Sequence, residues 1–225
     1  MKIDLHCHTE VSADCVTPLD LIPAKCLEQG IRIQAITDHD EVRGAQELQE
    51  TVESDPDLEL VIIVGEEIMT NRGEIIGLYL QERIEPGLSP AETVHQIHEQ
   101  GGLVLLPHGF DPLKRLRLDP VAREEIAHNI DIVETYNARI SRPRWNEAAA
   151  EWAEERDLPM SAGSDAHLLR DIGAAWLDVP FQLVNTPQDL LHCIRQGVPT
   201  GKWTHPVKAY VQKQWHHLKN RLGLS

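Results

Sequence analysis

The stretch Ile3-Asp4-Leu5-His6-Cys7-His8-Thr9 opens the chain with a short apolar run that ends in two histidines. Residues two positions apart on a strand point to the same face, so His6 and His8 make half of a metal site. Three later runs also stop at a histidine: Ala35-Ile36-Thr37-Asp38-His39, Leu103-Val104-Leu105-Leu106-Pro107-His108 and Ser161-Ala162-Gly163-Ser164-Asp165-Ala166-His167. This repeated pattern predicts several strands that carry ligands at the same end.

Helix and strand signals alternate along the chain. A capping residue followed by proline predicts helices that begin near Thr17, Ser89, Asp119 and Thr186, and a further helix is expected over residues 142–156. Short apolar runs between them predict buried parallel strands at residues 31–37, 58–68, 103–106, 130–136 and 159–162. Residues 73–80 are expected to pair as a hairpin with the strand before them. Repeated βαβ units predict a single α/β domain.

Functional groups of parallel α/β folds collect at the carboxyl ends of the strands. If the strands close into a barrel, the candidates converge on one mouth: His6, His8, Asp38, His39, Glu66 or Glu67, His108, Glu134, Asp165 and His167. Imidazole mixed with carboxylate suits Zn, Mn or Fe. So many ligands exceed the needs of one ion, and they predict two or three divalent ions, with a carboxylate bridging a pair.

Composition narrows the choice of partners. The formal net charge of −15 argues against binding to bulk nucleic acid or to an anionic membrane, but it leaves room for a small anionic substrate attracted by metal ions. The four cysteines form no C-x-x-C pair, and neither a leader-like segment nor an apolar run long enough to span a membrane is found. We therefore expect a cytoplasmic protein.

Four motifs carry a resemblance to a known family. His6-Cys7-His8, Thr37-Asp38-His39-Asp40, Pro107-His108 and Gly163-Ser164-Asp165-Ala166-His167 resemble, in order and spacing, the motifs of the PHP (polymerase and histidinol phosphatase) family. The resemblance covers about residues 3–175. It implies a distorted (β/α)7 barrel of the TIM type, a trinuclear metal centre and hydrolysis of phosphoesters.

The same resemblance implies a set of metal ligands. His6, His8 and Asp165 would bind one ion, His108 and Glu134 a second, and Asp14, His39 and His167 a third. The family's G-x-E motif points to Glu67 as the bridge between the first two. His39, His167 and Asp165 are the candidate catalytic residues.

A chemical mechanism follows from the charges. A water held between two cations loses its proton near neutral pH and attacks the phosphorus, while the cations neutralise the phosphoryl oxygens. Arg43 and Arg139 are candidates to bind the phosphate, because guanidinium matches its geometry; Arg142 and Arg144 are weaker ones. Ordinary salt bridges are the alternative for all four arginines.

The carboxyl-terminal segment differs from the rest. We expect the barrel to occupy residues 1–200 and a basic helix to follow over residues 201–225, packed on the barrel through Val211, Trp215, Leu218 and Leu222 or used for homo-oligomer formation. The predicted function is metal-dependent hydrolysis of a small phosphomonoester or nucleotide. The alternatives are an exonuclease acting on oligonucleotides and a non-catalytic scaffold or regulatory domain.

Overall fold

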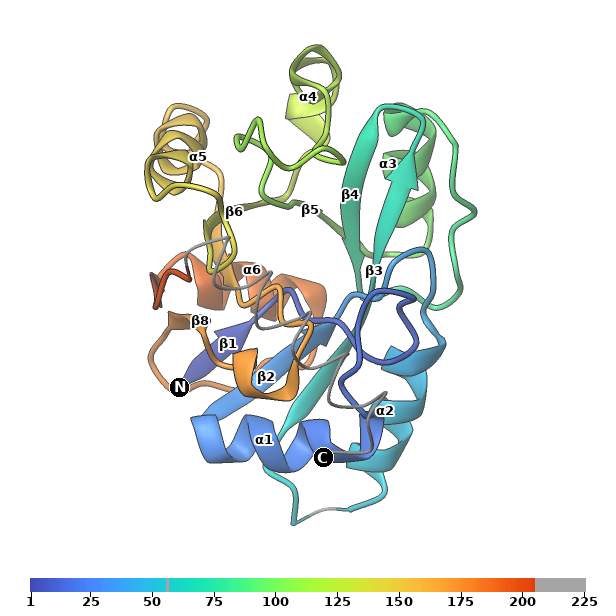
Figure 1. The fold of residues 1–225 in the computed structure, drawn as a ribbon, viewed down its shortest axis with the longest axis vertical. Coiled ribbons are helices and arrows are strands. Elements are labelled where there is room, and N and C mark those ends of the chain that lie inside the picture. Colours follow the sequence, from blue (N-terminus) through green and yellow to red (C-terminus); the bar gives the residue numbers. More distant parts are fainter. Residues whose placement is uncertain (56, 205–225) are drawn as a thin grey trace, which may run out of the picture.

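The computed structural model describes residues 1–55 and 57–204. Seven strands form a barrel, and two more extend the sheet in the order β7-β6-β5-β4-β3-β2-β1-β8-β9 (Figure 1). The strands are β1 (Lys2–Asp4), β2 (Ile31–Ile36), β3 (Val61–Thr70), β4 (Gly73–Leu78), β5 (Leu103–Leu106), β6 (Ile132–Asn137), β7 (Met160–Gly163), β8 (Ala175–Asp178) and β9 (Val198–Gly201).

The barrel closes between the first and the seventh strand. The residues after β1 run parallel to those of β7, with hydrogen bonds from Leu5 N to Ala162 O (3.1 Å) and from Asp165 N to His6 O (2.8 Å). A parallel bridge joins Cys7 to Ala166. The nearly closed barrel of the α/β class that the sequence predicts is therefore confirmed.

One strand of the barrel runs in the reverse direction. β4 pairs antiparallel with both β3 and β5, whereas the pairs β1–β2, β2–β3, β5–β6 and β6–β7 are parallel. β3 and β4 form the predicted hairpin, and its two-residue turn places Thr70 opposite Gly73. The start of β4 therefore lies at the rim where the parallel strands end.

Helices surround the barrel, and one of them, α6 (Pro187–Ile194), packs against the apolar layer inside it. They are α1 (Ile22–Gln29), α2 (Arg43–Glu53), α3 (Pro90–Glu99), α4 (Pro120–Ile126), α5 (Arg144–Glu154) and α6 (Pro187–Ile194), with short 3-10 turns at Leu19–Leu21, Ala127–Asn129 and Leu169–Asp171. Ser89 and Thr186 cap α3 and α6 with complete capping boxes, and Asp119 caps α4. The capping signals in the sequence therefore locate these three helices correctly.

Successive side chains of a strand point alternately into and out of the barrel, and they form two apolar layers. Ile33, Ala35 and Ile63 pack inside the barrel with Leu190 and Ile194 of α6, whereas Ile62 and Val64 pack outward with the other helices. Period-two alternation of this kind is the pattern expected of strands with two buried faces. The interior is thus filled with aliphatic side chains below the rim, so polar chemistry is confined to the mouth.

Three elements of the structure were not predicted from the sequence. α2 was not predicted, because its N-cap is Val42, whose side chain makes no capping hydrogen bond. β8 and β9 were also missed; they are four-residue antiparallel strands that lie outside the barrel. The helix predicted beyond β9 falls on residues 205–225, which lie outside the described residues.

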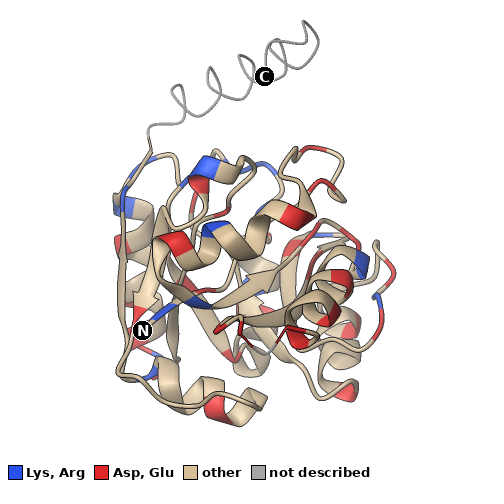
Figure 2. Ribbon diagram, turned by 90° about the horizontal axis from the view of Figure 1, so that it is seen from below, with Lys and Arg blue, Asp and Glu red and all other residues tan. Residues whose placement is uncertain are grey.

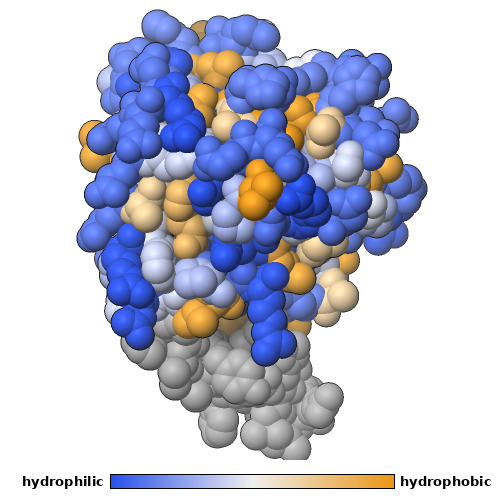
Figure 3. Space-filling view, turned by 90° about the horizontal axis from the view of Figure 1, so that it is seen from above, coloured by the Kyte–Doolittle hydropathy of each residue, from blue (hydrophilic) through white to orange (hydrophobic). Residues whose placement is uncertain are grey.

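The longest helices among the described residues, α2 and α5, have 11 residues each. No helix among the described residues is both long and apolar enough to cross a bilayer. Figure 3, which views the molecule from above Figure 1, shows a face that is mostly hydrophilic, with apolar residues in separate small groups.

Candidate metal centre

The first two ligand candidates follow β1 at the barrel rim. Asp4 Oδ1 accepts hydrogen bonds from the backbone N–H groups of His6 (3.2 Å) and Ser164 (3.0 Å), and so ties the ends of β1 and β7 together. The imidazoles of His6 and His8 then meet, with 3.1 Å between their Nε2 atoms. Both rings are buried, and Cys7 between them faces the outer apolar layer.

Glu67 is the centre of the cluster. Its Oε2 lies 3.3 Å from Nε2 of both His6 and His8, and its Oε1 lies 2.9 Å from Nε2 of His108. Asp165 Oδ1 lies 3.7 Å from His8 Nε2. A carboxylate with histidines on both oxygens has the position that a bridge between two ions requires. Glu66 points the other way, and its Oε2 accepts a hydrogen bond from Ile84 N.

Glu74 joins this group from the start of β4. Its Oε2 lies 3.7 Å from His108 Nε2, and its Oε1 lies 3.6 Å from His39 Nδ1. The carboxylate is buried, and Glu74 Oε1 and His108 Nδ1 have no hydrogen-bond partner among the described residues. Glu74 was not predicted from the sequence, because it lies near the beginning of a strand and the candidates were expected at strand ends.

Glu134 contacts two of the ligand candidates, His6 and His108. Its Oε1 accepts from His6 Nδ1 (3.0 Å), and its Oε2 accepts from His108 N (2.7 Å) and Asn137 Nδ2 (3.0 Å). Both oxygens are thus occupied by protein donors. The expected role of Glu134 as a direct ligand of the second ion stays a prediction.

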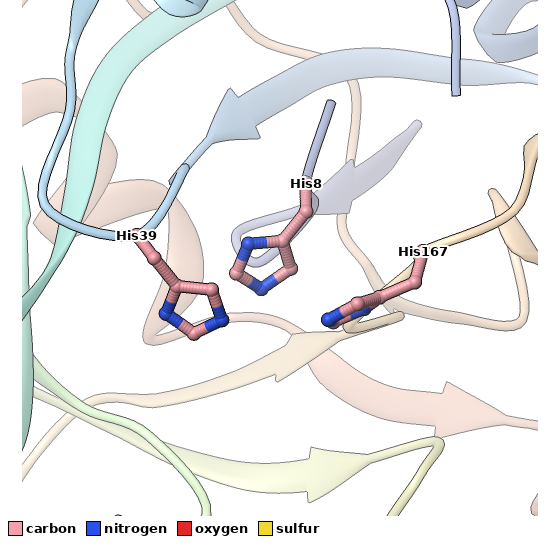
Figure 4. Close-up of side chains that lie close together, drawn as sticks. All are labelled: His8, His39 and His167. Carbon is pink, nitrogen blue, oxygen red and sulfur yellow. The ribbon is translucent and has the colours of Figure 1, made fainter. Parts of the chain in front are cut away.

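A third group gathers on the other side of His8. The rings of His8, His39 and His167 come from three strand ends and point toward one another (Figure 4). Ring centroids are 4.6 Å apart for His8 and His39 and 4.4 Å apart for His8 and His167. Asp14 lies beside them, 2.9 Å from His167 Nε2 and 3.8 Å from His39 Nε2. The expected trio of Asp14, His39 and His167 is therefore brought together.

Asp38 organises the loop under this group. The fully buried carboxylate accepts hydrogen bonds from Thr9 N, Thr9 Oγ1 and Ser12 Oγ, each at 2.7 Å. Ser12 Oγ in turn accepts from His39 N at 3.0 Å. Since its oxygens are used in this way, Asp38 holds the loop that carries Asp14 and does not face the ligand cluster.

Two ligand candidates have unusual backbone conformations. His108 (φ 28°) and Asp165 (φ 51°) lie in the left-handed region that non-glycine residues rarely adopt. Gly163 is required for a different reason: a Cβ there would collide with the Glu134 carboxylate and with His6 Cβ. Strain and close approach of this kind concentrate at functional sites.

The electrostatics of the cluster favour a cation. Burial would lower the pKa of His6, but Glu67, Glu134 and Asp165 outweigh it and raise that pKa well above its usual value. Burial, with Glu67 nearby, raises the pKa of Glu74 to about 9. The carboxylates therefore stabilise positive charge at the position that Nε2 of His6 faces, whether the charge is a proton or a metal ion.

Two cations border the cluster on the Asp165 side. Burial would raise the pKa of Asp165, but Lys114, Arg139 and His6 hold it well below its usual value. Arg139 also contacts His167 and donates to Asp165 O (3.0 Å). Lys114, whose ammonium pairs with Asp165, was not predicted from the sequence because it lies in a long loop.

The other arginine candidates lie apart from the cluster. Arg43 is exposed on the first turn of α2, and no ion pair or side-chain hydrogen bond links it to a ligand candidate among the described residues. Arg142 is exposed, and Arg144 stacks on Trp145. Arg139 is the one of these four that the structure brings to the ligands.

The donor set fits divalent metal ions. Four overlapping groups of three residues place nitrogen and oxygen atoms within 4.8 Å of one another: His6-His8-Glu67, His6-His108-Asp165, His8-His39-His167 and His39-Glu67-Glu74. Because His6 Nδ1 faces a carboxylate oxygen, it is the donor nitrogen, and the lone pair of the neutral ring lies on Nε2 toward the cluster. Neutral imidazole and carboxylate are the ligands that Zn, Mn and Fe use.

Several groups of histidine and carboxylate at one rim of an α/β barrel are the arrangement expected of a metal-binding α/β-barrel protein. Comparison with protein families narrows the class: the PHP domain model matches residues 4–155, and the PHP-associated model matches residues 143–199. The chain belongs to the PHP family.

The chain is also similar to individual proteins. An uncharacterised protein of Methanocaldococcus jannaschii is 34% identical over 193 residues, which cover 84% of this chain and 75% of the relative. A 5'-3' exoribonuclease of Haemophilus influenzae is 26% identical over 138 residues, 56% of this chain and 49% of that enzyme. This chain thus matches about half of the exoribonuclease.

Solved structures share the fold. PsfC from Pseudomonas syringae superposes with a TM-score of 0.71 at 16% identity, covering 97% of this chain and 98% of PsfC. A two-domain protein from Bacteroides vulgatus, containing a predicted PHP-like metal-dependent phosphoesterase, gives a TM-score of 0.69 at 15% identity over 90% of this chain and 65% of that protein.

Proposed function

We propose that this chain hydrolyses phosphate esters at a centre of two or three divalent metal ions, with a small phosphomonoester or nucleotide as substrate. The observation that carries the proposal is Glu67, whose two oxygens face His108 on one side and His6 and His8 on the other. The family membership and the phosphoesterase description of the B. vulgatus relative support it.

The residues would divide among three positions. His6, His8, Glu67 and Asp165 would hold one ion, His108, Glu67 and Glu74 a second, and Asp14, His39 and His167 a third. Bound ions would supply Lewis-acid chemistry, lowering the pKa of water and neutralising charge on the phosphoryl oxygens. Zn, Mn and Fe are all compatible with this donor set.

Side chains of the protein would bind the phosphate and transfer the proton. The Arg139 guanidinium is partly exposed beside Asp165 and His167, so it can bind a phosphoryl oxygen with charge-assisted hydrogen bonds. Burial, with His8 nearby, lowers the pKa of His167 to about 3, so this ring stays neutral. In a centre of two ions, in which His39 is not a ligand, this more exposed imidazole at the mouth would deliver a proton to the leaving oxygen.

A second candidate function is cleavage of oligonucleotide ends. The similarity to the exoribonuclease of H. influenzae favours it, whereas the net charge of −15 disfavours binding of long polyanions. A non-catalytic scaffold is disfavoured by the ligand candidates that are buried, among them His6, His8 and Glu67, because buried charged and polar groups are costly to retain without a cation.

One experiment separates these functions. Protein purified and reconstituted with Mn, Zn or Fe is analysed for bound metal and tested for phosphate release from phosphomonoesters, dinucleotides and single strands. Release from monoesters supports the main proposal, and release of mononucleotides from strands alone supports the second. Metal-loaded protein that is inactive on every substrate would favour the scaffold.

A further inference from the structure

A second charged feature lies beside the metal centre. A pocket of about 400 Å³ opens between the β3–β4 turn and the loop before α4. Its charged lining residues are Arg72, Lys114, Arg115, Arg117 and Asp119. Asp and Glu dominate the chain as a whole and are spread over the helices and loops seen in Figure 2. A pocket lined by four basic residues and one acidic residue therefore reverses the general charge of the molecule.

Two of the four cations are available to a ligand. The Arg72 guanidinium is neutralised by Asp119 (2.7 Å) and Glu125 (2.6 Å), and the Lys114 ammonium pairs with Asp165. In residues 1–55 and 57–204, no carboxylate forms an ion pair with Arg115 or Arg117. Unpaired guanidinium groups that line a pocket are the usual means of binding phosphate.

The loop that carries these arginines is fixed to the metal centre. Leu116 O accepts a hydrogen bond from Glu74 N (2.8 Å), and Arg72 O accepts one from Asp119 N (2.8 Å). A Cβ on Gly73, whose φ is 117°, would collide with the backbone carbonyl of Arg117. The loop is thus packed against the start of β4, one residue from a ligand candidate.

A buried acid anchors the other side of the loop. Asp111 Oδ1 accepts from Leu113 N (2.9 Å) and Ser141 Oγ (2.6 Å), and Asp111 Oδ2 accepts from Ser141 N (2.6 Å). Ser141 is two residues beyond Arg139. Lys114 lines the pocket and also contacts Asp165, a residue of the metal centre.

We propose that this basic pocket binds a second phosphate group of the substrate, and that Arg115 and Arg117 determine the preference for substrates that carry two phosphates. The proposal rests on the proposed phosphoesterase function and names the substrate class more closely. One phosphate would be cleaved at the metal centre while the other pairs with the guanidinium groups. The second phosphate is either terminal, as in a small bisphosphate, or internucleotide, as in an oligonucleotide.

The test compares matched substrates that differ by one phosphate. Glucose 6-phosphate is paired with glucose 1,6-bisphosphate, and thymidine 5'-monophosphate with the dinucleotide pdTdT. The proteins are the unchanged chain, Arg115→Ala, the double variant R115A/R117A and a control, Arg32→Ala. Arg32 is a half-exposed cation near the start of β2, where it pairs with Glu59, far along the strand from the rim.

The preference for the second phosphate is the decisive quantity. In the unchanged chain, kcat/KM is expected to be higher for the member of one pair that carries two phosphates. The double variant lowers that preference roughly tenfold to a hundredfold, mainly through KM, as expected for the loss of one or two charge-assisted hydrogen bonds. Arg115→Ala lowers it in part, and Arg32→Ala leaves it unchanged. The pair that responds identifies the source of the second phosphate.

Binding without turnover separates this proposal from the proposed function. Calorimetry on chelator-treated protein measures the Kd of each phosphate compound. Tighter binding of the compound with two phosphates supports phosphate binding in the pocket even if no phosphate is released, provided that it is weakened in R115A/R117A and kept in Arg32→Ala. Equal kcat/KM and equal Kd within both pairs, or a preference that the double variant leaves intact, would overturn it.

Discussion

Glu134 accepts a hydrogen bond from Nδ1 of His6 at 3.0 Å, at the base of the metal centre. This contact fixes the orientation of the ring and directs Nε2 toward Glu67. Carboxylates that hold a ligating histidine in this way raise the basicity of the nitrogen that meets the metal. Because both oxygens of Glu134 accept from protein donors, we expect the residue to act on the site through His6 and His108.

Substitution of Glu134 tests this role. Glutamine retains one acceptor oxygen where three donors converge, so Glu134→Gln is expected to weaken metal binding about 10- to 100-fold. At saturating metal the number of ions bound should stay the same, as measured by titration and element analysis. Loss of one ion at saturation would instead make Glu134 a direct ligand.

Glu67 and Glu66 form a matched pair of neighbours on opposite faces of β3. Glu67→Gln should lose bound metal and lower phosphate release at least about 100-fold, because both of its oxygens face histidines. Burial raises the pKa of Glu66 to about 8, so Glu66→Gln resembles the protonated form and should retain metal and activity. Element analysis and a phosphate-release assay on both variants decide; equal effects would contradict the assignment.

Glu74 is the ligand candidate that strand-end reasoning did not find. Glu74→Gln is expected to reduce the metal content by one ion, since the carboxylate lies between His108 and His39. The fold should survive, because glutamine has nearly the same shape. A variant with unchanged metal content and unchanged Kd for metal would show that Glu74 has no ligating role.

Removal of metal should destabilise the protein. A ligand present at 1,000 times its Kd stabilises the folded state by about 4 kcal/mol, which corresponds to roughly 10 °C in Tm for a chain of this length. We expect chelation to lower Tm by about this amount and the readdition of Mn, Zn or Fe to restore it. Differential scanning calorimetry measures the change, and Glu67→Gln should respond much less.

The cysteines should be unreactive in the folded protein. All four are buried, and burial raises the pKa of Cys15 to about 11 and that of Cys7 well above its usual value. The thiolate is the reactive form, so Ellman's reagent at about pH 8 should label none of them until the chain is unfolded in guanidinium chloride. Rapid labelling of one thiol in the folded, metal-loaded protein would contradict this.

Much of the site could be predicted because its ligands follow strands. His6, His8, His39, His108 and His167 each end an apolar or small-residue run, and parallel strands bring such ends to one rim. The geometry brings all five imidazoles into the cluster. Periodicity and capping residues likewise located most of the barrel, because strand burial and helix capping are local physical effects.

The remaining features of the site depend on tertiary contacts that no local sequence pattern encodes. Glu74 begins its strand and reaches the rim because β4 runs in reverse. Lys114 arrives through a loop whose position is set by Asp111 and Gly73. The role of Glu134 depends on the orientation of its carboxylate, which accepts hydrogen bonds from three donors. Arg43 was a candidate because guanidinium matches the geometry of phosphate, but it lies on the first turn of α2, outside the cluster.

The hairpin of β3 and β4 has a consequence for how this chain could change. Glu67 and Glu74 belong to one two-stranded unit, in which Glu67 stands opposite Ile76 and Glu74 opposite Met69. A single residue inserted into the turn at positions 71–72 would slip this pairing and rotate Glu74 out of the mouth, while the apolar packing below could largely persist. The length of this turn therefore decides whether Glu74 reaches the rim, so a one-residue insertion would remove one ligand candidate from the cluster without unfolding the barrel.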